Sequence, residues 1–492
     1  MTANNQTIFN NNNNKGALTM KATDGKLELM LKTANQVKKT EQSILEDEER
    51  KLAAFDPKTA SAIEKKEHNK MKFLHYKPFW WRKLQLKWNN DCTVGAIMNT
   101  VLENVVVIIE NDEATINSFA FNEFTRKHIS KRDIDLRGHI FESGYVSNMM
   151  ISAIRTYIEV NYKVSFSEKM IAPAIDLVGY YNKFNPVADY MKASHEKWIN
   201  AGKPEVLDDF FVNSLGVEKS ELTTLKTRIF FAEMVTKGMH PEKSADFVLD
   251  LVGGQGCGKT RTLRRLGLDW YVEDVPNFHD KDQIIKMCSA LLVNDDEMKA
   301  TRSSGLEQTK SFITSIEQTY RVPYGVKAET VTKNCVLSRT TNNAEYLNDI
   351  TGDRRFMPMM CVKGNKTKDI SEYSDDEIAM LFGEAFDIIE NGFDYNKLTA
   401  EQSMMLEDSR EDFTLISEEQ SVIDRYLSTF DGDFISMGDL MENAFNIKAG
   451  ELASGKLQSK ISSVMAAKYE DWRKARRRVD GSRYRGWERV NK

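Results

Sequence analysis

The sequence predicts a multidomain α/β protein, with a helical N-terminal domain, a core domain around a central parallel sheet, and a small C-terminal domain of helices and a hairpin. Three observations predict this class. From residue 245 to residue 358, apolar strand-like runs alternate with helical segments, which is typical of a parallel sheet. Between residues 78 and 194, apolar side chains recur at spacings of three and four, which favours helices. After residue 417, three helical segments precede two β-prone runs joined by a turn signal.

Length and composition limit the kind of protein. The chain has 492 residues and a net charge of −5, with 41% apolar and 29% charged residues, which is an ordinary globular mixture. No apolar run is long enough for a transmembrane helix, and the N-terminus has no apolar signal region, so we expect no membrane contact. The five cysteines are scattered, unlike those of a zinc site or a disulfide framework, which favours a reducing cytoplasm.

Four regions are expected along the chain. Residues 1–75 combine an Asn-rich disordered tail with a charged helical arm, which could contact a partner or be a solvated tether. Residues 76–200 form the mainly helical domain, and residues 205–400 form the α/β domain. Residues 415–492 form the C-terminal domain, and its final part, 468–492, has ten basic and four acidic side chains on an otherwise acidic chain. This asymmetry indicates a local contact with a polyanion.

A glycine-rich loop carries the most specific signal. The strand-like residues 247–252 are followed by G-x-x-x-x-G-K-T and then by a helix, a context that a chance glycine-rich turn would lack. Glycines let backbone N–H groups surround phosphates without Cβ clashes, and the helix N-terminus adds positive potential. Lys259 is expected at the β- and γ-phosphates of ATP, and Thr260 on Mg²⁺. The loop residues expected to bind ATP are Gly253, Gly254, Gln255, Gly256, Cys257, Gly258, Lys259, Thr260 and Arg261.

A second motif is acidic. The apolar residues 290–293 form a strand-like run that leads into Asp295, Asp296 and Glu297. Acids at the C-terminal end of a parallel strand stand where a phosphate-hydrolysing site needs a metal ligand and a base for the attacking water. We assign Asp296 to the metal and Glu297 to the base, and Asp295 is the competing metal ligand. The alternative is an acidic helix N-cap, because Asp and Glu favour that position.

Two further polar clusters follow in order. Residues 334–341 form another apolar strand-like run, after which Asn342 could bind the attacking water or the γ-phosphate. Alone, such a cluster would indicate only a turn. Arg354 and Arg355 come next, and arginine is suited to stabilising the charge of a transferred phosphate. A pair of surface arginines in local ion pairs is the alternative.

The C-terminal pattern of three helices and a hairpin is that of a winged helix-turn-helix. Four arginines near the hairpin turn, at positions 476, 478, 483 and 485, are expected to contact DNA phosphates or to enter a groove. A basic tail without structure is the alternative, but aromatic side chains are interleaved with the basic ones and favour a folded wing.

Several short motifs occur in a fixed order along the chain. They are NPVADYM at 185–191, the glycine-rich loop, DWY at 269–271, KD at 281–282, RVPYG at 321–325, TTN at 340–342 and TGDRRF at 351–356. This ordered set resembles the virulence-associated protein E family of phages and mobile islands, whose ATPase core is similar to superfamily 3 and other AAA+ helicases. The resemblance covers roughly residues 90–359 and implies that Asn342 is the sensor asparagine and that Arg354 or Arg355 is an arginine finger.

One departure from the family concerns the acidic motif. The family often has an acid–x–x–acid pattern there, and this chain has Asn294 at the first position and Glu297 at the second. Longer relatives often carry a primase region, and no such region is expected before residue 75.

The resemblance also suggests how a ring could hold DNA. Two β-prone runs between residues 320 and 333 could form a hairpin, which related helicases place in the ring channel. Lys327 would be its tip on the single strand, and Lys333 a further contact. A loop at a ring interface is the equal alternative.

These expectations combine into an ATP-dependent DNA helicase or replication initiator of a phage or genomic island, located in the cytoplasm of a bacterial host. We expect a homo-hexamer that hydrolyses ATP with Mg²⁺ at subunit interfaces, with single-stranded DNA in the channel and duplex DNA at the winged helix. A replication protein is a possible partner of the N-terminal arm. The alternative is a non-motor, ATP-gated DNA-binding loader or regulator. A small-molecule kinase is disfavoured, because no acceptor lid is evident.

Overall fold

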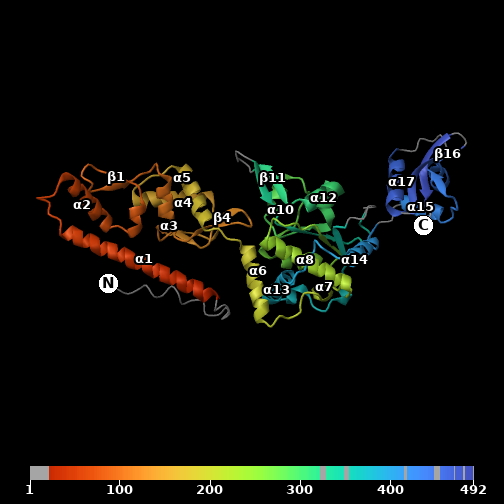
Figure 1. Ribbon diagram of the computed structural model, residues 1–492, viewed down its shortest axis with the longest axis horizontal. Helices are drawn as coiled ribbons and strands as arrows, with labels where there is room; N and C mark the ends of the chain where they lie inside the picture. Colours follow the sequence, from red (N-terminus) through yellow and green to blue (C-terminus); the bar gives the residue numbers. More distant parts are fainter. Residues whose placement is uncertain are drawn as a thin grey trace. The chain divides into compact units, whose positions relative to one another are not determined.

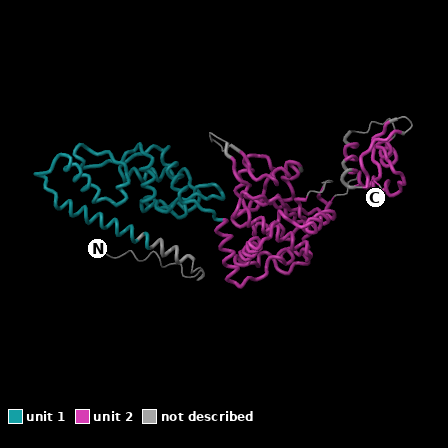
Figure 2. The backbone as a smooth tube through the Cα atoms, viewed as in Figure 1, with its two compact units in different colours: residues 1–186 teal, residues 187–492 magenta. Residues whose placement is uncertain are grey.

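The computed structural model describes residues 22–321, 328–347, 354–414, 418–447, 455–469, 471–479 and 482–490. Its contacts divide the chain into two compact units, residues 1–186 and residues 187–492 (Figure 2). Residues 1–21 of the predicted disordered tail lie outside the described residues.

The predicted arm forms two helices, α1 (Ala22–Ala53) and α2 (Ala62–His75), which appear in red in Figure 1. Helix α2 begins at a capping box, in which Ser61 and Glu64 each accept a hydrogen bond from the other's backbone N–H. Helix α1 is tied to the next element, the 3₁₀ turn η1 (Phe79–Lys83), because Arg82 donates to Glu48 at 2.7 Å. The arm is therefore packed against the globular part of its own unit.

The rest of the first unit mixes helices with short strands. Helix α3 includes residues 105–109, all buried, so this β-branched run forms a helix in the core and not a strand. The expectation of a mainly helical domain missed seven strands of two to four residues, which are too short to show a period-2 pattern. The helices are α3 (Leu102–Asn111), α4 (Asn148–Tyr162) and α5 (Glu168–Tyr181), and the strands are β1 (Leu86–Trp88), β2 (Gly95–Ile97), β3 (Phe119–Asn122), β4 (Lys127–Ser130), β5 (Ile134–Leu136), β6 (His139–Phe141) and β7 (Gly144–Tyr145).

The second unit is built on a five-stranded sheet in the order β14-β8-β13-β10-β9. All four strand pairs are parallel, so the carboxyl ends of the five strands meet at one edge. Strands β8 and β13 are buried along their whole length, as expected for a sheet covered on both faces. The strands are β8 (Val248–Val252), β9 (Tyr271–Val272), β10 (Leu292–Asp295), β13 (Val336–Thr341) and β14 (Phe356–Met360).

Helices surround this sheet in the middle of Figure 1. Helix α8 is buried along most of its length, polar residues included. The described helices are α6 (Pro186–Asn200), α7 (Phe210–Leu215), α8 (Glu221–Met239), α9 (Lys259–Gly267), α10 (Lys281–Cys288), α11 (Lys299–Ser304), α12 (Leu306–Thr314), α13 (Asp375–Glu390) and α14 (Ala400–Glu411), with 3₁₀ turns η2 (Leu268–Trp270), η3 (Asp296–Met298), η4 (Lys363–Asn365) and η5 (Ile370–Glu372).

A hairpin that is not part of the main sheet forms where the sequence left a hairpin or an interface loop open. Strands β11 (Glu317–Arg321) and β12 (Ala328–Thr332) pair antiparallel. Its predicted tip, Lys327, lies outside the described residues. The predicted DNA contact at Lys333 is wrong, because this side chain is 3% exposed and its ammonium donates to the backbone carbonyls of Phe312 and Ile313.

The C-terminal residues form a three-stranded antiparallel sheet with helices, ordered β15-β17-β16. The two tryptophans Trp472 and Trp487 are buried in its core with Ile435. The sequence predicted the helices and the hairpin but missed β15, which has three residues. The elements are α15 (Glu418–Leu427), β15 (Phe434–Ser436), α16 (Met437–Asp439) with the π-helical turn η6 (Leu440–Ala444), α17 (Gly455–Lys468), β16 (Trp472–Val479) and β17 (Ser482–Arg489).

Candidate functional site

The glycine-rich loop connects β8 to α9 at the carboxyl edge of the sheet. Gly258 precedes the helix at φ +95°, a conformation that L side chains rarely adopt. Gly253 has no room for a side chain, since a Cβ there would lie 2.4 Å from the carbonyl oxygen of Cys361. The ammonium of Lys259 lies inside the loop and donates to the carbonyls of Gly253 at 2.6 Å and Gly254 at 3.2 Å. The loop therefore holds the Lys259 ammonium against its own backbone carbonyls.

Asp296 follows β10 and faces the start of α9. Its carboxylate accepts hydrogen bonds from the hydroxyls of Thr260 at 3.0 Å and Thr340 at 2.8 Å. Within the described residues, no cluster of three or more His, Cys, Asp or Glu side chains could hold a metal by itself. Mg²⁺, however, commonly takes one or two protein oxygens and completes its shell with phosphate and water. The Thr260 hydroxyl and the Asp296 carboxylate fit that requirement, and the cation would supply charge to neutralise the phosphates.

Asp295, the competing metal ligand, does not fit the role. It is fully buried, and its carboxylate accepts hydrogen bonds from the backbone N–H groups of Ala300 and Thr301, both at 2.8 Å, and from the Thr301 hydroxyl at 2.6 Å. Burial raises the pKa of Asp295, and these hydrogen bonds oppose that shift. Asp295 thus fixes the turn before α11, as an acidic cap does, and both of its carboxylate oxygens accept hydrogen bonds there.

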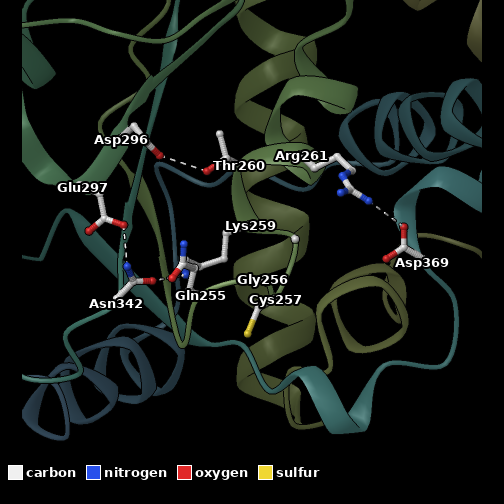
Figure 3. Close-up of a pocket in the computed structure, with 11 residues that line it drawn as sticks. Gln255, Gly256, Cys257, Lys259, Thr260, Arg261, Asp296, Glu297, Asn342 and Asp369 are labelled. Atoms are coloured by element: carbon white, nitrogen blue, oxygen red, sulfur yellow. Dashed lines mark hydrogen bonds and ion pairs between the residues drawn. The ribbon is translucent and has the colours of Figure 1, made fainter.

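Glu297 and Asn342 meet over the loop (Figure 3). The amide of Asn342 donates to Glu297 Oε1 at 2.8 Å, and its carbonyl oxygen accepts from Lys259 Nζ at 2.9 Å. Glu297 and the next residue, Met298, both have positive φ, at 52° and 54°, which is strained for side chains other than glycine. This strained turn directs the carboxylate toward Asn342, and such strain is common at functional sites.

A buried ion pair holds the strands beneath these groups in register. The guanidinium of Arg339 on β13 donates to both carboxylate oxygens of Asp250 on β8, at 2.7 and 2.5 Å, and both residues are almost completely buried. The Tyr346 hydroxyl also donates to Asp250. The bidentate geometry fixes the orientation of the Arg339 and Asp250 side chains and so the position of β13 relative to β8. Asn342, which directly follows β13, is thereby held beside the loop.

The pocket above the loop has a cavity of about 300 Å³. Its lining includes every predicted loop residue from Gln255 to Arg261, together with Asp296, Glu297 and Asn342. It also includes Asp369, which no sequence motif singled out. Asn342 comes directly after β13, whereas Asp369 lies well beyond the end of β14 at Met360, so no strand-end signal marks it.

Arg354 and Arg355 lie at the opposite edge of the sheet. They come just before β14, and the carbonyl of Arg355 accepts a hydrogen bond from Val248 N, at the start of β8. Both arginines line a separate cavity of about 700 Å³. Five residues of strand span about 16 Å, so neither arginine is near the glycine-rich loop of the same chain.

The predicted DNA contacts of the C-terminal hairpin come together in space. On β16 and β17, Arg476 lies opposite Arg485, and Arg478 opposite Arg483. Paired residues and residues two apart share a face of a ribbon, so the four arginines form one exposed face near the turn. We call these four residues the arginine face. Among described residues, none of the four forms an ion pair, whereas Arg473 and Arg477 on the other face pair with Glu488 and Asp433.

Comparison with known families gives one match. Residues 194–415 match the model of the virulence-associated protein E-like domain. The chain carries a virulence-associated protein E-like domain. The match confirms the resemblance to the virulence-associated protein E family from residue 194 onward, and the similarity to superfamily 3 stays a prediction. All the pocket residues, and also Arg354 and Arg355, fall inside the virulence-associated protein E-like domain, and the arginine face lies after it.

No curated protein matches the chain. Apo structures of the NrS-1 C-terminal region align at 12% identity over 76% of this chain and 96% of that chain, with TM-scores of 0.38 and 0.35. In the described part of the chain, no helix is both long and apolar enough to cross a bilayer.

Proposed function

We propose that the protein is an ATP-dependent DNA helicase or replication initiator of a phage or genomic island. Its virulence-associated protein E-like domain would be an AAA+ core similar to superfamily 3, and it would work as a homo-hexameric ring. The observation that carries the proposal is the hydrogen-bonded chain from Lys259 through Asn342 to Glu297 above the glycine-rich loop. It connects a phosphate-binding cation, a polar sensor and a carboxylate in one pocket.

Each of these groups has a role in hydrolysis. Glu297 accepts the proton of the water that attacks the γ-phosphorus, and Asn342 orients that water. Lys259 and the loop N–H groups stabilise the negative charge on the transferred phosphoryl group. Asp296 and Thr260 would hold Mg²⁺, which would neutralise phosphate charge, and the products are ADP and phosphate.

The position of the arginines supports an assembly. Arg354 and Arg355 are at the amino edge of the sheet, while the loop is at the carboxyl edge. Neither can reach the phosphates of its own subunit, but a neighbour in a ring could present them to the next pocket. Either arginine could be the finger, since both line the same cavity.

The C-terminal residues supply the DNA-binding part of the proposal. We infer a winged helix from the three helical segments and the three-stranded sheet, with β16 and β17 as the wing. The arginine face has no acidic partner among described residues, so phosphates are suitable counter-ions for it.

The deciding experiment is ATP turnover with and without DNA, on the wild type and on Glu297→Gln. We expect DNA to stimulate turnover and the variant to lose about 100-fold or more of kcat, because the base is removed. Glu307→Gln, an exposed glutamate on α12, is the control and should behave as the wild type. Turnover that survives Glu297→Gln would overturn the assignment of the base.

A strand-displacement assay separates the motor from an ATP-gated loader. A helicase displaces a labelled strand only while it hydrolyses ATP. A loader would bind DNA in an ATP-dependent way and leave the duplex intact.

A further inference from the structure

A third carboxylate in the pocket needs an explanation. The lining contains Asp296, Glu297 and Asp369 beside the cations Lys259 and Arg261. In the proposed function, which this inference extends, Asp296 serves the metal and Glu297 the water. Asp369 has no such task, and a free carboxylate facing a triphosphate would repel it.

The contacts of Asp369 show how its charge is neutralised. One carboxylate oxygen lies 2.7 Å from the ammonium of Lys366. The other accepts the backbone N–H and the hydroxyl of Ser371 and lies 3.6 Å from the guanidinium of Arg261. The Lys366 ammonium and the Ser371 hydrogen bonds hold the pKa of Asp369 well below its usual range. Asp369 therefore stays an anion between two cations.

Asp369 and Lys366 belong to a segment that is fixed to the rest of the fold. We call residues 361–369 the strap. Its first residue donates to the Val252 carbonyl at 2.7 Å, and Thr367 and Lys368 both donate to the Asn213 carbonyl. Lys366 also donates to the carbonyl of Cys257 in the glycine-rich loop, at 3.3 Å, and its side chain is only 12% exposed. The strap thus links the end of β14 to the loop.

The position of Arg261 and Asp369 in the pocket indicates which part of a nucleotide they would contact. Figure 3 places Glu297 and Asn342 on one side of the loop and Arg261 with Asp369 on the other. Because hydrolysis requires the γ-phosphate near Glu297, the far side faces the nucleoside end of the phosphate chain. At 3.6 Å the contact between Arg261 and Asp369 is long for an ion pair, and the Arg261 side chain is 67% exposed. The Arg261 guanidinium lines the pocket, and this long contact leaves its N–H donors available to a phosphate.

We propose that Asp369 is a positioning residue of the pocket: with Lys366 as its counter-ion, it directs the Arg261 guanidinium onto the phosphate nearest the nucleoside. Asp369 then acts only through Arg261. When Arg261 is absent, the carboxylate no longer helps and only repels the phosphates.

The test is a double-mutant cycle on nucleotide affinity. Equilibrium binding of a non-hydrolysable ATP analogue with Mg²⁺ would be measured on the full chain, for the wild type, Arg261→Ala, Asp369→Asn and the double variant. We expect about a tenfold loss of affinity for Arg261→Ala and about a threefold loss for Asp369→Asn, as for a lost or misaligned charge-assisted hydrogen bond. The double variant should bind no more weakly than Arg261→Ala. Asparagine is a good N-cap, so Asp369→Asn keeps the turn at η5.

Two matched controls come from an exposed ion pair in the same unit. Lys197 on α6 pairs with Asp376 on α13, and neither side chain lines the pocket or the adjacent cavity that Arg261 also lines. Lys197→Ala and Asp376→Asn should leave the affinity unchanged.

Three outcomes would overturn the proposal. Unchanged affinity in either single variant would remove the role of that residue. Losses that multiply in the double variant would mean that Asp369 acts independently of Arg261. A loss in Asp369→Asn that vanishes for the 2′-deoxy analogue would mean that the carboxylate binds ribose. A wild type that binds no nucleotide would instead refute the proposed function itself.

Discussion

Asp295 and Asp296 are adjacent in the chain, yet they have different partners. The Asp295 carboxylate accepts hydrogen bonds from backbone N–H groups at the start of α11. The Asp296 carboxylate accepts them from the hydroxyls of Thr260 and Thr340. We predict that Asp295→Ala lowers stability by about 1–3 kcal/mol, because it leaves buried N–H groups without an acceptor. Asp296→Asn should keep its melting temperature but lose Mg²⁺-dependent ATP turnover. Thermal unfolding measures the stability of both variants, and a Mg²⁺ titration measures their ATP turnover. If Asp295→Ala lost Mg²⁺-dependent turnover and Asp296→Asn lost only stability, Asp295 would be the metal ligand.

Lys226 gives a prediction about pH. It is buried on α8, and its ammonium donates to the carbonyl of Pro358 at 2.7 Å. Burial, reinforced by the positive charge of Arg410, lowers the pKa of Lys226 to about 7. Between this value and the ordinary one near 10.5, the unfolded chain binds the proton and the folded chain does not, so stability rises with pH.

Lys226→Met should remove that dependence. Relative to the wild type, the variant should be stabilised near pH 7, by at most about 5 kcal/mol, and the advantage should shrink toward pH 9.5. The loss of the donor to Pro358 will offset part of the gain. Urea unfolding of both proteins at the two pH values measures the difference, and a gap that does not change with pH would contradict the prediction.

At the scale of the element, the hairpin of β16 and β17 has two unlike faces. The arginine face sets like charges directly opposite one another, which costs stability, whereas Arg473 on the other face has an acidic partner at 2.8 Å. We predict that Arg476→Gln with Arg485→Gln weakens duplex binding about equally for unrelated sequences. The slope of log affinity against log salt should fall by up to about 1.8, which corresponds to two phosphate contacts.

Stability distinguishes a binding effect from a folding effect in this hairpin. Removing like charges should leave the melting temperature unchanged or raise it. Arg473→Gln is the matched control and should leave the salt slope unchanged. If the control changes the slope as much as the pair, the arginine face is not the DNA contact.

Elements also differ in how far the sequence could predict them. The glycine-rich loop, Glu297 and Asn342 were found because each follows a strand-like run of its own, so the signal is local. Asp369 was missed because its place in the pocket shows only through its contact with Arg261, which is more than a hundred residues away in the chain. Lys333 was wrongly placed on the surface, since no local pattern reveals that backbone carbonyls of α12 solvate its ammonium. Strands such as β15 were too short to show alternation.

For the whole molecule, the main question is whether one subunit completes the pocket of another. The strands of the sheet are parallel, so the loop and the arginines lie at opposite edges of one subunit. We therefore predict that the double variant Arg354→Ala with Arg355→Ala loses ATP turnover while still binding nucleotide, because its own pocket is intact. Glu297→Gln should also bind and fail to hydrolyse.

Mixing the two inactive proteins tests whether the arginines act between subunits. In a mixed assembly, some interfaces join an intact Glu297 from the arginine variant to intact arginines from the Glu297 variant, and these interfaces should hydrolyse ATP. Turnover should therefore reappear on mixing and depend on the ratio of the two proteins, with a maximum between the pure forms. Mixtures that stay inactive, although the two proteins are shown to co-assemble, would mean that the arginines do not act on a neighbour's phosphates. The ring would then lose its main structural support.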